Sequence, residues 1–292
     1  YAEAHNNLGN VLKDLGQLDN SIKNFEKAIA IKPDYAEVYY NLSVTFQELG
    51  QLDEAVKSCK MAITINPDFV EAHSNLGLTL MALGQQDDAA DKSYKKAIAI
   101  NPDYAEAYFN RGILMAGLKR LDEALASYEC ALDLKPDLDF LLGSSLHTKM
   151  HLCLWDDLPN HVNELIKKIN NGEKVVNPFS LLALIDDPEL QMKASEIFVN
   201  KKFPKNYDLP EIGQHPKHKK IRIGYFSADL SSLHPVSALT AELYEVHDRN
   251  QFEIHAFSFG PDTKDKMNLR IKAGVDHFHE VHTMSHKDVV LL

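Results

Sequence analysis

The chain has 292 residues, which is enough for about two domains. Its 45% hydrophobic and 25% charged residues are typical of a globular protein, and its formal net charge of -11 excludes non-specific binding to nucleic acid, which requires clustered Lys and Arg. No apolar run is long enough to span a bilayer and the N-terminus has no signal-peptide pattern, so we expect a cytoplasmic protein without a membrane partner.

Four prolines divide the first half of the chain at nearly constant intervals. Pro33, Pro67, Pro102 and Pro136 are 34, 35 and 34 residues apart, and one additional residue within 84–91 accounts for the longer interval. A period near 34 with a proline closing each unit is typical of tetratricopeptide repeats, in which each unit is a helix pair. We therefore predict that residues 1–137 are four such repeats, stacked into an α-solenoid.

Equivalent positions of the four units carry side chains of similar size. When each proline is counted as position 32, position 8 is small, position 24 is mostly large and position 27 is alanine, as close packing of two helices requires. The residues are Gly9, Ser43, Gly77 and Gly112 at position 8, Phe25, Cys59, Tyr94 and Tyr128 at position 24, and Ala28, Ala62, Ala97 and Ala131 at position 27. Gly16, Gly50 and Gly84 follow the first helix of three units, where a left-handed residue is favoured.

The joints between the units resemble capped helix starts. Each proline is followed by Asp, and at three joints Glu comes three residues later, in the pairs Asp34 and Glu37, Asp68 and Glu71, and Asp103 and Glu106. This capping-box pattern satisfies free amides at a helix start, so these acids are expected to be structural. The fourth joint lacks the pattern, which predicts the end of the array, and residues 1–3 repeat the Tyr-Ala-Glu of residues 104–106, so we expect the chain to begin inside a longer array.

The three cysteines lie far apart and form no C-x-x-C motif. Cys59 and Cys130 fall at helical positions where a small apolar side chain is expected, whereas Cys153 lies beyond the repeats. We predict buried, reduced thiols.

Position 6 of every unit is asparagine, and the repeat pattern itself supplies no packing role for it. The column consists of Asn7, Asn41, Asn75 and Asn110. It shares a stripe of the first helix with positions 2, 9 and 13, which in stacked repeats faces the concave groove. An amide offers a donor and an acceptor together, so such a column could bind the backbone of an extended peptide whatever its sequence. The alternative is a tolerated polar residue on a solvated face, copied by repeat duplication.

After residue 140 the periodicity stops, and residues 138–220 are predicted to be a helical linker. The apolar segment 141–155 and the amphipathic segment 158–169 are expected to be helices. Residues 203–220 contain three prolines and many charges, which is typical of a connecting segment.

The pattern changes again at residue 221, where strands begin to alternate with helices. Strands are predicted at 221–227, 252–259 and 277–281, and helices at 235–246 and 267–273. This alternation is the start of a parallel, doubly wound sheet, so residues 221–292 are predicted to be the first part of a Rossmann-like lobe that continues beyond Leu292. The whole chain is thus predicted to combine an α-solenoid with an α/β lobe.

Known site motifs are missing from this lobe. No G-x-G-x-x-G, Walker loop or G-x-S-x-G follows the first strand. The histidines at 277, 279, 282 and 286 suggest zinc, yet no cysteine or carboxylate at ligand spacing accompanies them. His277 and His279 would share one face of a strand, so exposed or hydrogen-bonded histidines, and no metal, are expected.

The order of these regions, and several short motifs, resemble the O-linked N-acetylglucosamine (O-GlcNAc) transferase family of bacterial type, whose relatives include the SPINDLY-type protein O-fucosyltransferases. In the lobe the resemblance is carried by RIGYFSADL at 222–230, His234-Pro235, Pro261-Asp262 and Asn268-Leu269-Arg270. In the linker it is carried by Met150-His151-x-Cys153-x-Trp155, Pro178-Phe179 and Asp187-Pro188.

The resemblance implies a GT-B catalytic region, in which two Rossmann-like lobes flank the active site. It implies an inverting, metal-independent transfer of a sugar from a nucleotide sugar, UDP-GlcNAc, to Ser or Thr of proteins, without a cofactor. The repeats would bind the acceptor polypeptide, and the asparagine column matches the family's asparagine ladder. His234 matches the active-site histidine, as a proton relay or a phosphate contact, and Asp288 matches an acid that influences the proton path.

Alternatives remain open for the function of the chain, for the donor and for two site residues. The nucleotide-sugar pocket of the family lies mostly in the second lobe, so the chain alone is expected to be inactive. A non-catalytic repeat scaffold with a degenerate lobe is the alternative from another class of function. A fucosyl nucleotide is the alternative donor. For His234, a helix-start histidine bonded to the backbone is the structural alternative, and for Asp288 it is an acid in the first turn of a helix.

Overall fold

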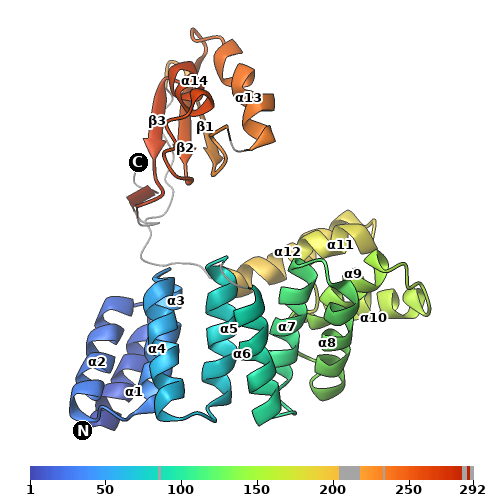
Figure 1. The fold of residues 1–292 in the computed structure, drawn as a ribbon. Helices are drawn as coiled ribbons and strands as arrows, with labels where there is room; N and C mark the ends of the chain where they lie inside the picture. Colours follow the sequence, from blue (N-terminus) through green and yellow to red (C-terminus); the bar gives the residue numbers. More distant parts are fainter. Residues whose placement is uncertain (85–86, 204–217, 233, 285–287, 290–292) are drawn as a thin grey trace. The chain divides into compact units, whose positions relative to one another are not determined.

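The computed structural model describes residues 1–292 apart from 85–86, 204–217, 233, 285–287 and 290–292 (Figure 1). Two compact units make up the chain, Tyr1–Pro204 and Lys205–Leu292. The helices of the predicted linker therefore belong to the same unit as the repeats. Within the described residues, no helix is both long enough and apolar enough to cross a membrane.

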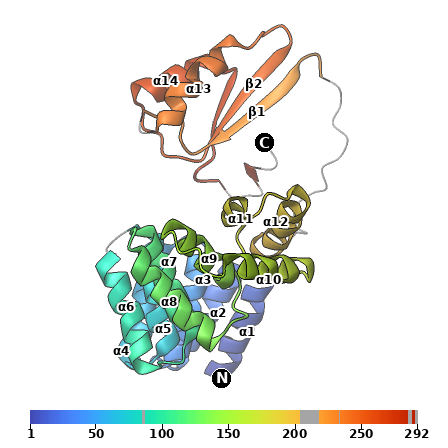
Figure 2. The same ribbon diagram turned by 90° about the vertical axis from the view of Figure 1, so that its right-hand side faces the viewer.

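The repeat array consists of the predicted eight helices in four pairs. They are α1 (Ala2–Asp14), α2 (Leu18–Ile31), α3 (Ala36–Glu48), α4 (Leu52–Ile65), α5 (Val70–Ala82), α6 (Asp87–Ile100), α7 (Ala105–Gly117) and α8 (Leu121–Leu134). Each pair packs together and then onto the next pair (Figures 1 and 2). Contacts also join the first helices of successive repeats, α1 to α3, α3 to α5 and α5 to α7, so these helices line one side of the array. The predicted α-solenoid is confirmed.

Positions 8, 24 and 27 of the repeats, the size columns, lie where the two helices of a pair contact each other. A Cβ added at Gly9 would lie 2.5 Å from the Phe25 ring, and one at Gly112 would lie 2.4 Å from Tyr128. The larger side chains at position 24 and the alanines at position 27 are almost completely buried. In the second repeat Ser takes the place of Gly and Cys59 takes the place of the ring, so the combined volume remains small. Glycine is therefore needed where its partner is aromatic.

The turns within the repeats use left-handed residues, as expected. Gly16 and Gly50 have φ of 73° and Gly84 has φ of 61°. In the fourth repeat Lys119 adopts φ of 62° at the same position, although it has a Cβ. This conformation costs an L-residue roughly 1–2 kcal/mol. The packing of the flanking helices therefore determines this turn even without glycine.

The predicted capping boxes are wrong. Helices α3, α5 and α7 begin after Tyr35, Phe69 and Tyr104, and none of these three starts has a side-chain cap among the described residues. The aspartates precede the N-cap by one residue, which is too early for the box geometry. At two joints the preceding asparagine accepts instead, because Asn66 and Asn101 bind the backbone N–H of the aspartate two residues later.

The cysteine prediction is correct for Cys59 only. Cys59 is buried, whereas Cys130 and Cys153 are exposed. Cys130 comes two residues after the buried Tyr128, and two residues turn a helix by about 200°, so its side chain lies on the outer face of α8.

Four further helices pack on the last repeat. They are α9 (Leu141–His151), α10 (Leu158–Asn170), α11 (Pro178–Leu184) and α12 (Pro188–Lys202). Their core is apolar and includes Leu146, Leu165, Ile169 and Leu181. The segment 174–176 runs across the start of α9, where the carbonyls of Lys174 and Val175 accept from the N–H groups of Phe140 and Gly143 at 2.6 and 2.8 Å.

The second unit has the predicted parallel sheet. Its elements are β1 (Ile221–Ser227), α13 (Pro235–Val246), β2 (Phe252–Ser258), α14 (Lys266–Gly274) and β3 (His277–Glu280), and the strand order is β1-β2-β3. Arg222 is paired with Glu253 and His255 with His277 in the register. The strand–helix alternation at 221–281 thus folds as the sequence predicts.

Both helices of this unit cover the same face of the sheet (Figure 2). On that face Tyr225, Ala256 and Phe278 pack against the helices. Because side chains alternate along a strand, the neighbouring residues point to the other face. There Phe226 stacks on Phe257 with a centroid distance of 4.4 Å and remains 59% exposed. This face thus carries exposed aromatic rings and, nearer the beginnings of the strands, the polar side chains of Arg222, Glu253 and His277.

Candidate functional site

The asparagine column lies on the first helices of the four repeats, but its members have different environments. Asn7 is exposed, Asn110 is half-buried, and Asn41 and Asn75 are each only 9% exposed. The four residues occupy the same repeat position on helices that contact one another in sequence. A row of amides along one side of the array therefore remains a prediction for peptide binding.

Packing explains part of this column, contrary to the sequence analysis. The Asn41 amide donates to Asn6 Oδ1 at 2.9 Å, and the Asn75 amide donates to Ser43 Oγ at 2.9 Å. Both bonds cross from one repeat to the preceding one. An amide has two N–H groups and an oxygen, so each bond uses a fraction of its capacity. Asn41 and Asn75 thus hold neighbouring repeats together, whatever else they bind.

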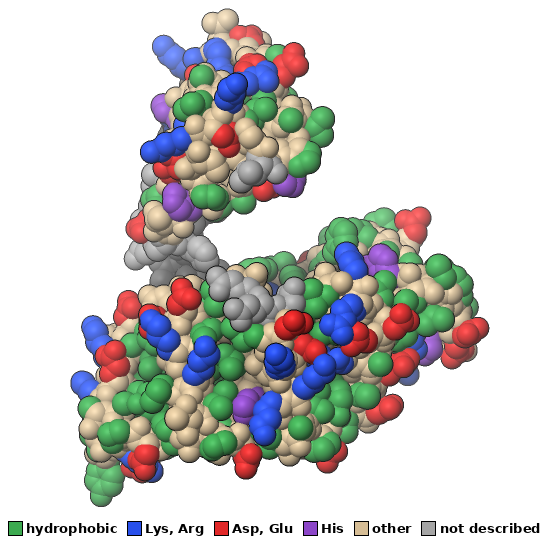
Figure 3. All heavy atoms as spheres, viewed as in Figure 1, with side chains coloured by type: hydrophobic (Ala, Val, Ile, Leu, Met, Phe, Trp, Pro, Cys, Tyr) green, Lys and Arg blue, Asp and Glu red, His purple; other side chains and the backbone are tan. Residues whose placement is uncertain are grey.

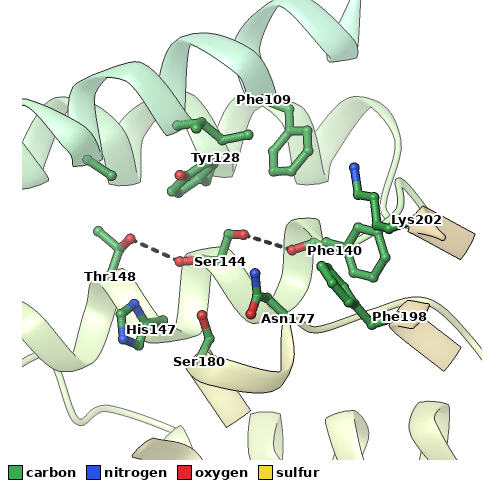
Figure 4. Close-up of a pocket in the computed structure, with 12 residues that line it drawn as sticks. Phe109, Tyr128, Phe140, Ser144, His147, Thr148, Asn177, Ser180, Phe198 and Lys202 are labelled. Atoms are coloured by element: carbon green, nitrogen blue, oxygen red, sulfur yellow. Dashed lines mark hydrogen bonds between the residues drawn. The ribbon is translucent and has the colours of Figure 1, made fainter. Parts of the chain in front are cut away.

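A pocket of about 370 Å³ opens between the last repeat and the helices behind it. Its wall includes Ile113, which shares the helix stripe of Asn110, and Phe109. Figure 4 shows Phe109 and Tyr128 on one side and Phe140, Phe198 and Lys202 on another. The pocket is lined by aromatic rings at the point where the predicted peptide groove ends. Its shape and chemistry suit an apolar side chain.

Acidic and basic side chains are interspersed over the repeats on the face drawn in Figure 3. Ion pairs such as Lys57 with Glu54 and Lys135 with Glu106 join some of them. Charges of both signs thus alternate on this face of the repeats (Figure 3).

In the second unit, His234 directly precedes α13 at the carboxyl edge of the sheet. Its Nδ1 accepts the backbone N–H of Val236 at 3.2 Å, so the side chain caps the helix, and the ring is exposed. The carboxylate of Asp229 lies 3.8 Å from the same nitrogen. Loops at the carboxyl ends of parallel strands form the binding crevice of such folds. The structural alternative, a helix-start histidine bonded to the backbone, thus accounts for the hydrogen bond of Nδ1. It does not involve Nε2 of the exposed ring.

The loop that carries His234 is held by residues after β2. Asp265 accepts from the Ser232 hydroxyl at 2.6 Å and from its N–H at 3.0 Å, and it also caps α14. The Asn268 amide, which is 1% exposed, donates to the Leu230 carbonyl at 2.9 Å. The hydroxyl of Ser232 thus has a carboxylate partner in an exposed loop. Asn268 was singled out by the resemblance, and in the structure it positions this loop.

Asp265 is strongly acidic because of these bonds. Hydrogen bonds from Ser232 and Thr263, and then from backbone N–H groups, hold the pKa of its carboxyl far below the usual range. The carboxylate therefore stays charged while it connects the loop after β1 to the start of α14. Sequence reasoning missed this residue because the contact joins two loops that occur only once in the chain, 33 positions apart.

Asp288, the second predicted catalytic residue, is exposed and helical. Of the four histidines noted in the sequence, His277 and His279 lie on β3, His282 follows it in a turn, and His286 lies outside the described residues.

The structure brings a carboxylate to the histidines that the sequence analysis considered alone. His277 Nε2 lies 3.0 Å from Glu253 Oε1, and His255 Nε2 lies 3.6 Å from the same oxygen. Glu253 and His255 alternate on β2, so both point to one face beside β3. The expectation that no carboxylate accompanies these histidines is wrong. The signal was the Glu-x-His pair on one predicted strand and His-x-His on the next.

Family models match two regions of the chain. Residues 9–50, 45–84 and 79–119 match a TPR repeat model, and residues 105–138 match a tetratricopeptide repeat model. Residues 192–288 match the model of glycosyl transferase family 41.

One curated relative is the probable UDP-N-acetylglucosamine–peptide N-acetylglucosaminyltransferase SEC of Arabidopsis thaliana. It is 27% identical over 156 residues, which are 48% of this chain and 16% of that protein. The chain therefore spans a small part of the length of this relative.

Solved structures resemble the chain at low sequence identity. A TPR protein of Thermus thermophilus has a TM-score of 0.50 and 22% identity over 68% of this chain and 100% of its own. A mutant of the Thermobaculum terrenum O-GlcNAc transferase has a TM-score of 0.46 and 20% identity over 87% of this chain and 42% of its own. The family matches confirm the resemblance found in the sequence: tetratricopeptide repeats at 9–138 are followed by a segment, 192–288, that matches glycosyl transferase family 41.

Proposed function

We propose that the chain is the acceptor-binding array and the beginning of the first catalytic lobe of a protein O-glycosyltransferase. The enzyme would transfer N-acetylglucosamine from UDP-GlcNAc to Ser and Thr of cytoplasmic proteins. The match of residues 192–288 to glycosyl transferase family 41, in a chain that also carries a repeat array, supports this proposal. The name of the Arabidopsis relative supports the donor and a peptide acceptor.

The reaction is a single displacement with inversion, without a metal or another cofactor. The acceptor hydroxyl oxygen forms a bond to the anomeric carbon while the bond from that carbon to the diphosphate oxygen breaks. UDP departs with the bonding electrons, and the hydroxyl proton is transferred to a base or to solvent. Groups that stabilise the negative charge on the diphosphate therefore accelerate the transfer.

The hydrogen bonding of His234 favours a phosphate contact over a proton relay. A neutral imidazole has one protonated and one unprotonated nitrogen. Because Nδ1 accepts from Val236, the proton is assigned to Nε2, which then donates and cannot accept the hydroxyl proton. The first amides of α13 lie beside it, and the N-terminus of a helix favours phosphate. His234 would thus bind the donor diphosphate.

The acceptor polypeptide would bind along the asparagine column. Asn7 and Asn110 are the accessible members, whereas the amide nitrogens of Asn41 and Asn75 donate to the preceding repeat, that of Asn75 to both Ser43 and Cys59. The apolar pocket next to Asn110 would take a hydrophobic side chain of the same peptide. This division predicts that the accessible amides contribute more to peptide affinity than the buried ones.

Two variants of His234 in the full-length protein test the catalytic part of this proposal. His234→Asn keeps a side-chain acceptor for the helix start, because Asn is a good N-cap, whereas His234→Ala removes both cap and ring. A diphosphate contact predicts that both variants raise the Michaelis constant for UDP-GlcNAc and lower turnover by roughly 10²-fold or more, by analogy with the loss of one oxyanion donor. Steady-state kinetics with both substrates varied measures this.

The outcomes distinguish three roles. Wild-type kinetics in His234→Asn would show that His234 only caps α13. A loss of turnover by about 10²–10⁴ with unchanged donor affinity would indicate a proton relay instead. Absence of transfer from any nucleotide sugar, including a fucosyl donor, in a well-folded full-length protein that still binds peptides would favour the non-catalytic scaffold. The 292-residue chain alone is expected to be inactive in the same assay.

A further inference from the structure

One group of metal-binding side chains in the second unit is unused by the proposed transfer. Glu253, His255 and His277 each offer one ligand atom, and these atoms lie within 4.8 Å of one another. The group lies on the face of the sheet opposite α13 and α14. Its residues are near the beginnings of β2 and β3, whereas His234 follows the carboxyl end of β1. It is thus separate from the predicted active site.

The distances in this group suit a small divalent ion. Bonds of about 2.0–2.1 Å in tetrahedral geometry place ligand atoms roughly 3.3 Å apart. The oxygen of Glu253 is 3.0 Å from Nε2 of His277 and 3.6 Å from Nε2 of His255. The two imidazoles stack with centroids 4.4 Å apart, so a modest ring rotation completes the triangle. Two histidines and one glutamate are also a known catalytic zinc ligand set that leaves a fourth position open.

Neighbouring side chains hold two of these ligands in orientation. Nδ1 of His255 lies 3.1 Å from Nε2 of His279, and Nε of Arg222 lies 2.9 Å from the other oxygen of Glu253. Metal-binding histidines usually donate their second ring N–H to such a partner, which fixes the ligating nitrogen. With Nδ1 of His255 bound to His279, Nε2 carries the free lone pair. That nitrogen is buried and has no hydrogen-bond partner among the described residues.

Solvent reaches the group from one side. A hollow of about 370 Å³ is lined by Lys219, Lys220, Arg222, Asp276, Glu253 and His277, among others. The hollow gives an ion an entry path, and water can fill the remaining coordination positions. The positive charges of Arg222 and the lysines oppose a cation, so a hard ion that relies on charge, such as Mg²⁺, is disfavoured. Imidazole ligands instead suit zinc and its neighbours.

We propose that Glu253, His255 and His277 bind a divalent transition-metal ion, with zinc as the representative, and that the ion fastens β2 to β3. Because the ligands come from two strands, binding stabilises the folded lobe by mass action. The transfer reaction does not require the ion. The proposal therefore stands or falls independently of the glycosyltransferase function.

Zinc titration of the 292-residue chain tests the site, with cobalt as a spectroscopic probe. We expect one zinc ion per chain from calorimetry, and slower hydrogen exchange of peptides from β2 and β3 when zinc is present. His255→Phe keeps an aromatic ring beside Phe257, and Glu253→Gln keeps the shape of the acid. Each should weaken zinc binding by more than the roughly 10–100-fold that is usual for an outer-shell change, and His279→Phe should weaken it within that range.

His282→Ala is the matched control, because His282 is an exposed histidine of the same unit outside the group. It should leave zinc affinity unchanged, which matters because the chain has 14 histidines and adventitious binding is easy. Equal affinity in wild type, His255→Phe and Glu253→Gln would overturn the proposal, as would no binding at millimolar zinc. Circular dichroism of each variant must match the wild type, and His277→Phe repeats the test if one of them fails to fold.

Discussion

The repeat array and the sheet unit depend on contacts of similar reach along the chain, yet only the first could be read in detail from sequence. The bond from Asn75 to Ser43 spans 32 residues, and the bond from Arg222 to Glu253 spans 31. The array shows the same helix pair four times, so the packing positions of one repeat can be compared with those of the others. The sheet occurs once. Contacts can therefore be predicted from sequence where the structural unit is repeated, even when the contacting residues are far apart in the chain.

The same difference has an energetic side. In a solenoid each unit contacts only its neighbours, so stability is roughly a sum of units and interfaces. The three-stranded sheet buries one face only, and its other face carries Phe226 and the histidine group at the surface. A single change should therefore act locally in the array, whereas in the sheet its effect depends on contacts that recur nowhere else.

The strongest test of the recurring packing is Tyr94→Ala in the third repeat. The Tyr94 side chain is fully buried against Gly77, so its removal leaves a cavity and should lower the free energy of unfolding by about 3–5 kcal/mol. Urea denaturation followed by circular dichroism measures this. Tyr94→Phe is the matched control, because the hydroxyl is buried and has no partner within the part of the chain that the structure describes.

Tyr94→Phe should be as stable as the wild type or more stable, since it removes an unsatisfied polar group. A loss close to that of Tyr94→Ala would mean that the hydroxyl, and not the ring, holds the repeat together. In that case the size columns would not explain the packing.

An intermediate effect is expected for the asparagine column, and it separates structural from binding roles. Asn75→Ala removes two buried hydrogen bonds, to Ser43 Oγ and to Cys59 Sγ, and should cost about 1–3 kcal/mol. The exposed Asn7→Ala should change stability by less than about 0.5 kcal/mol. If the ladder proposal holds, Asn7→Ala still weakens the binding of an unstructured peptide, measured by fluorescence anisotropy. Unchanged peptide affinity in Asn7→Ala and Asn110→Ala together would remove the ladder.

The smallest effect concerns the sheet unit and depends on pH. The pKa of Asp265 is depressed in the folded state, mainly by hydrogen bonds from Ser232 and Thr263, so its contribution to stability is present above the unfolded value of about 4. That contribution is lost as the pH falls below about 4 towards the folded pKa. The protection of the loop that carries His234 against hydrogen exchange, relative to the intrinsic exchange rate at each pH, should therefore decrease in this range.

Asp265→Asn is the control for the pH effect. It removes the titrating group, so the loop should exchange faster at neutral pH and respond less to acid. An identical acid response in wild type and Asp265→Asn would assign the effect to other carboxylates, such as Asp262 or Glu245, whose pKa values are also lowered by hydrogen bonds from cationic side chains.

Sequence predicted the elements of both units, because periodicity and alternation reflect which face is buried. It failed where a residue departs from its column or where partners lie on different strands. Arg111 stands where the other repeats have leucine, and it bonds Asp91 at 2.7 Å and Ser127 at 2.8 Å. The repeat pattern does not predict those partners, because no other repeat has an arginine at this position. The capping boxes failed for a related reason, since a pattern of residue types does not specify where a helix begins.

Part of the candidate sites could be predicted from the same two signals, repetition and the order of strands and helices. His234 was found from its place after a strand and before a proline, and the asparagine column from repetition. The sequence could not show that Nδ1 of His234 is committed to Val236, nor that Glu253 lies beside His277. Both depend on side-chain directions that arise from strand register and from the helix start.

The segment 174–176, which runs across the start of α9, has a consequence for the length of the repeat array. It satisfies the amides at the start of α9, and Val176 packs against Gly143, so the helices behind the last repeat close that end of the stack. Within the array, the first helix of each repeat packs on the second helix of the repeat before it, and α9 packs on α8 in the same way. Helix α9 therefore occupies the surface on which a fifth repeat would stack. In a repeat array, where each unit contacts only its neighbours, such a covered end prevents growth in that direction.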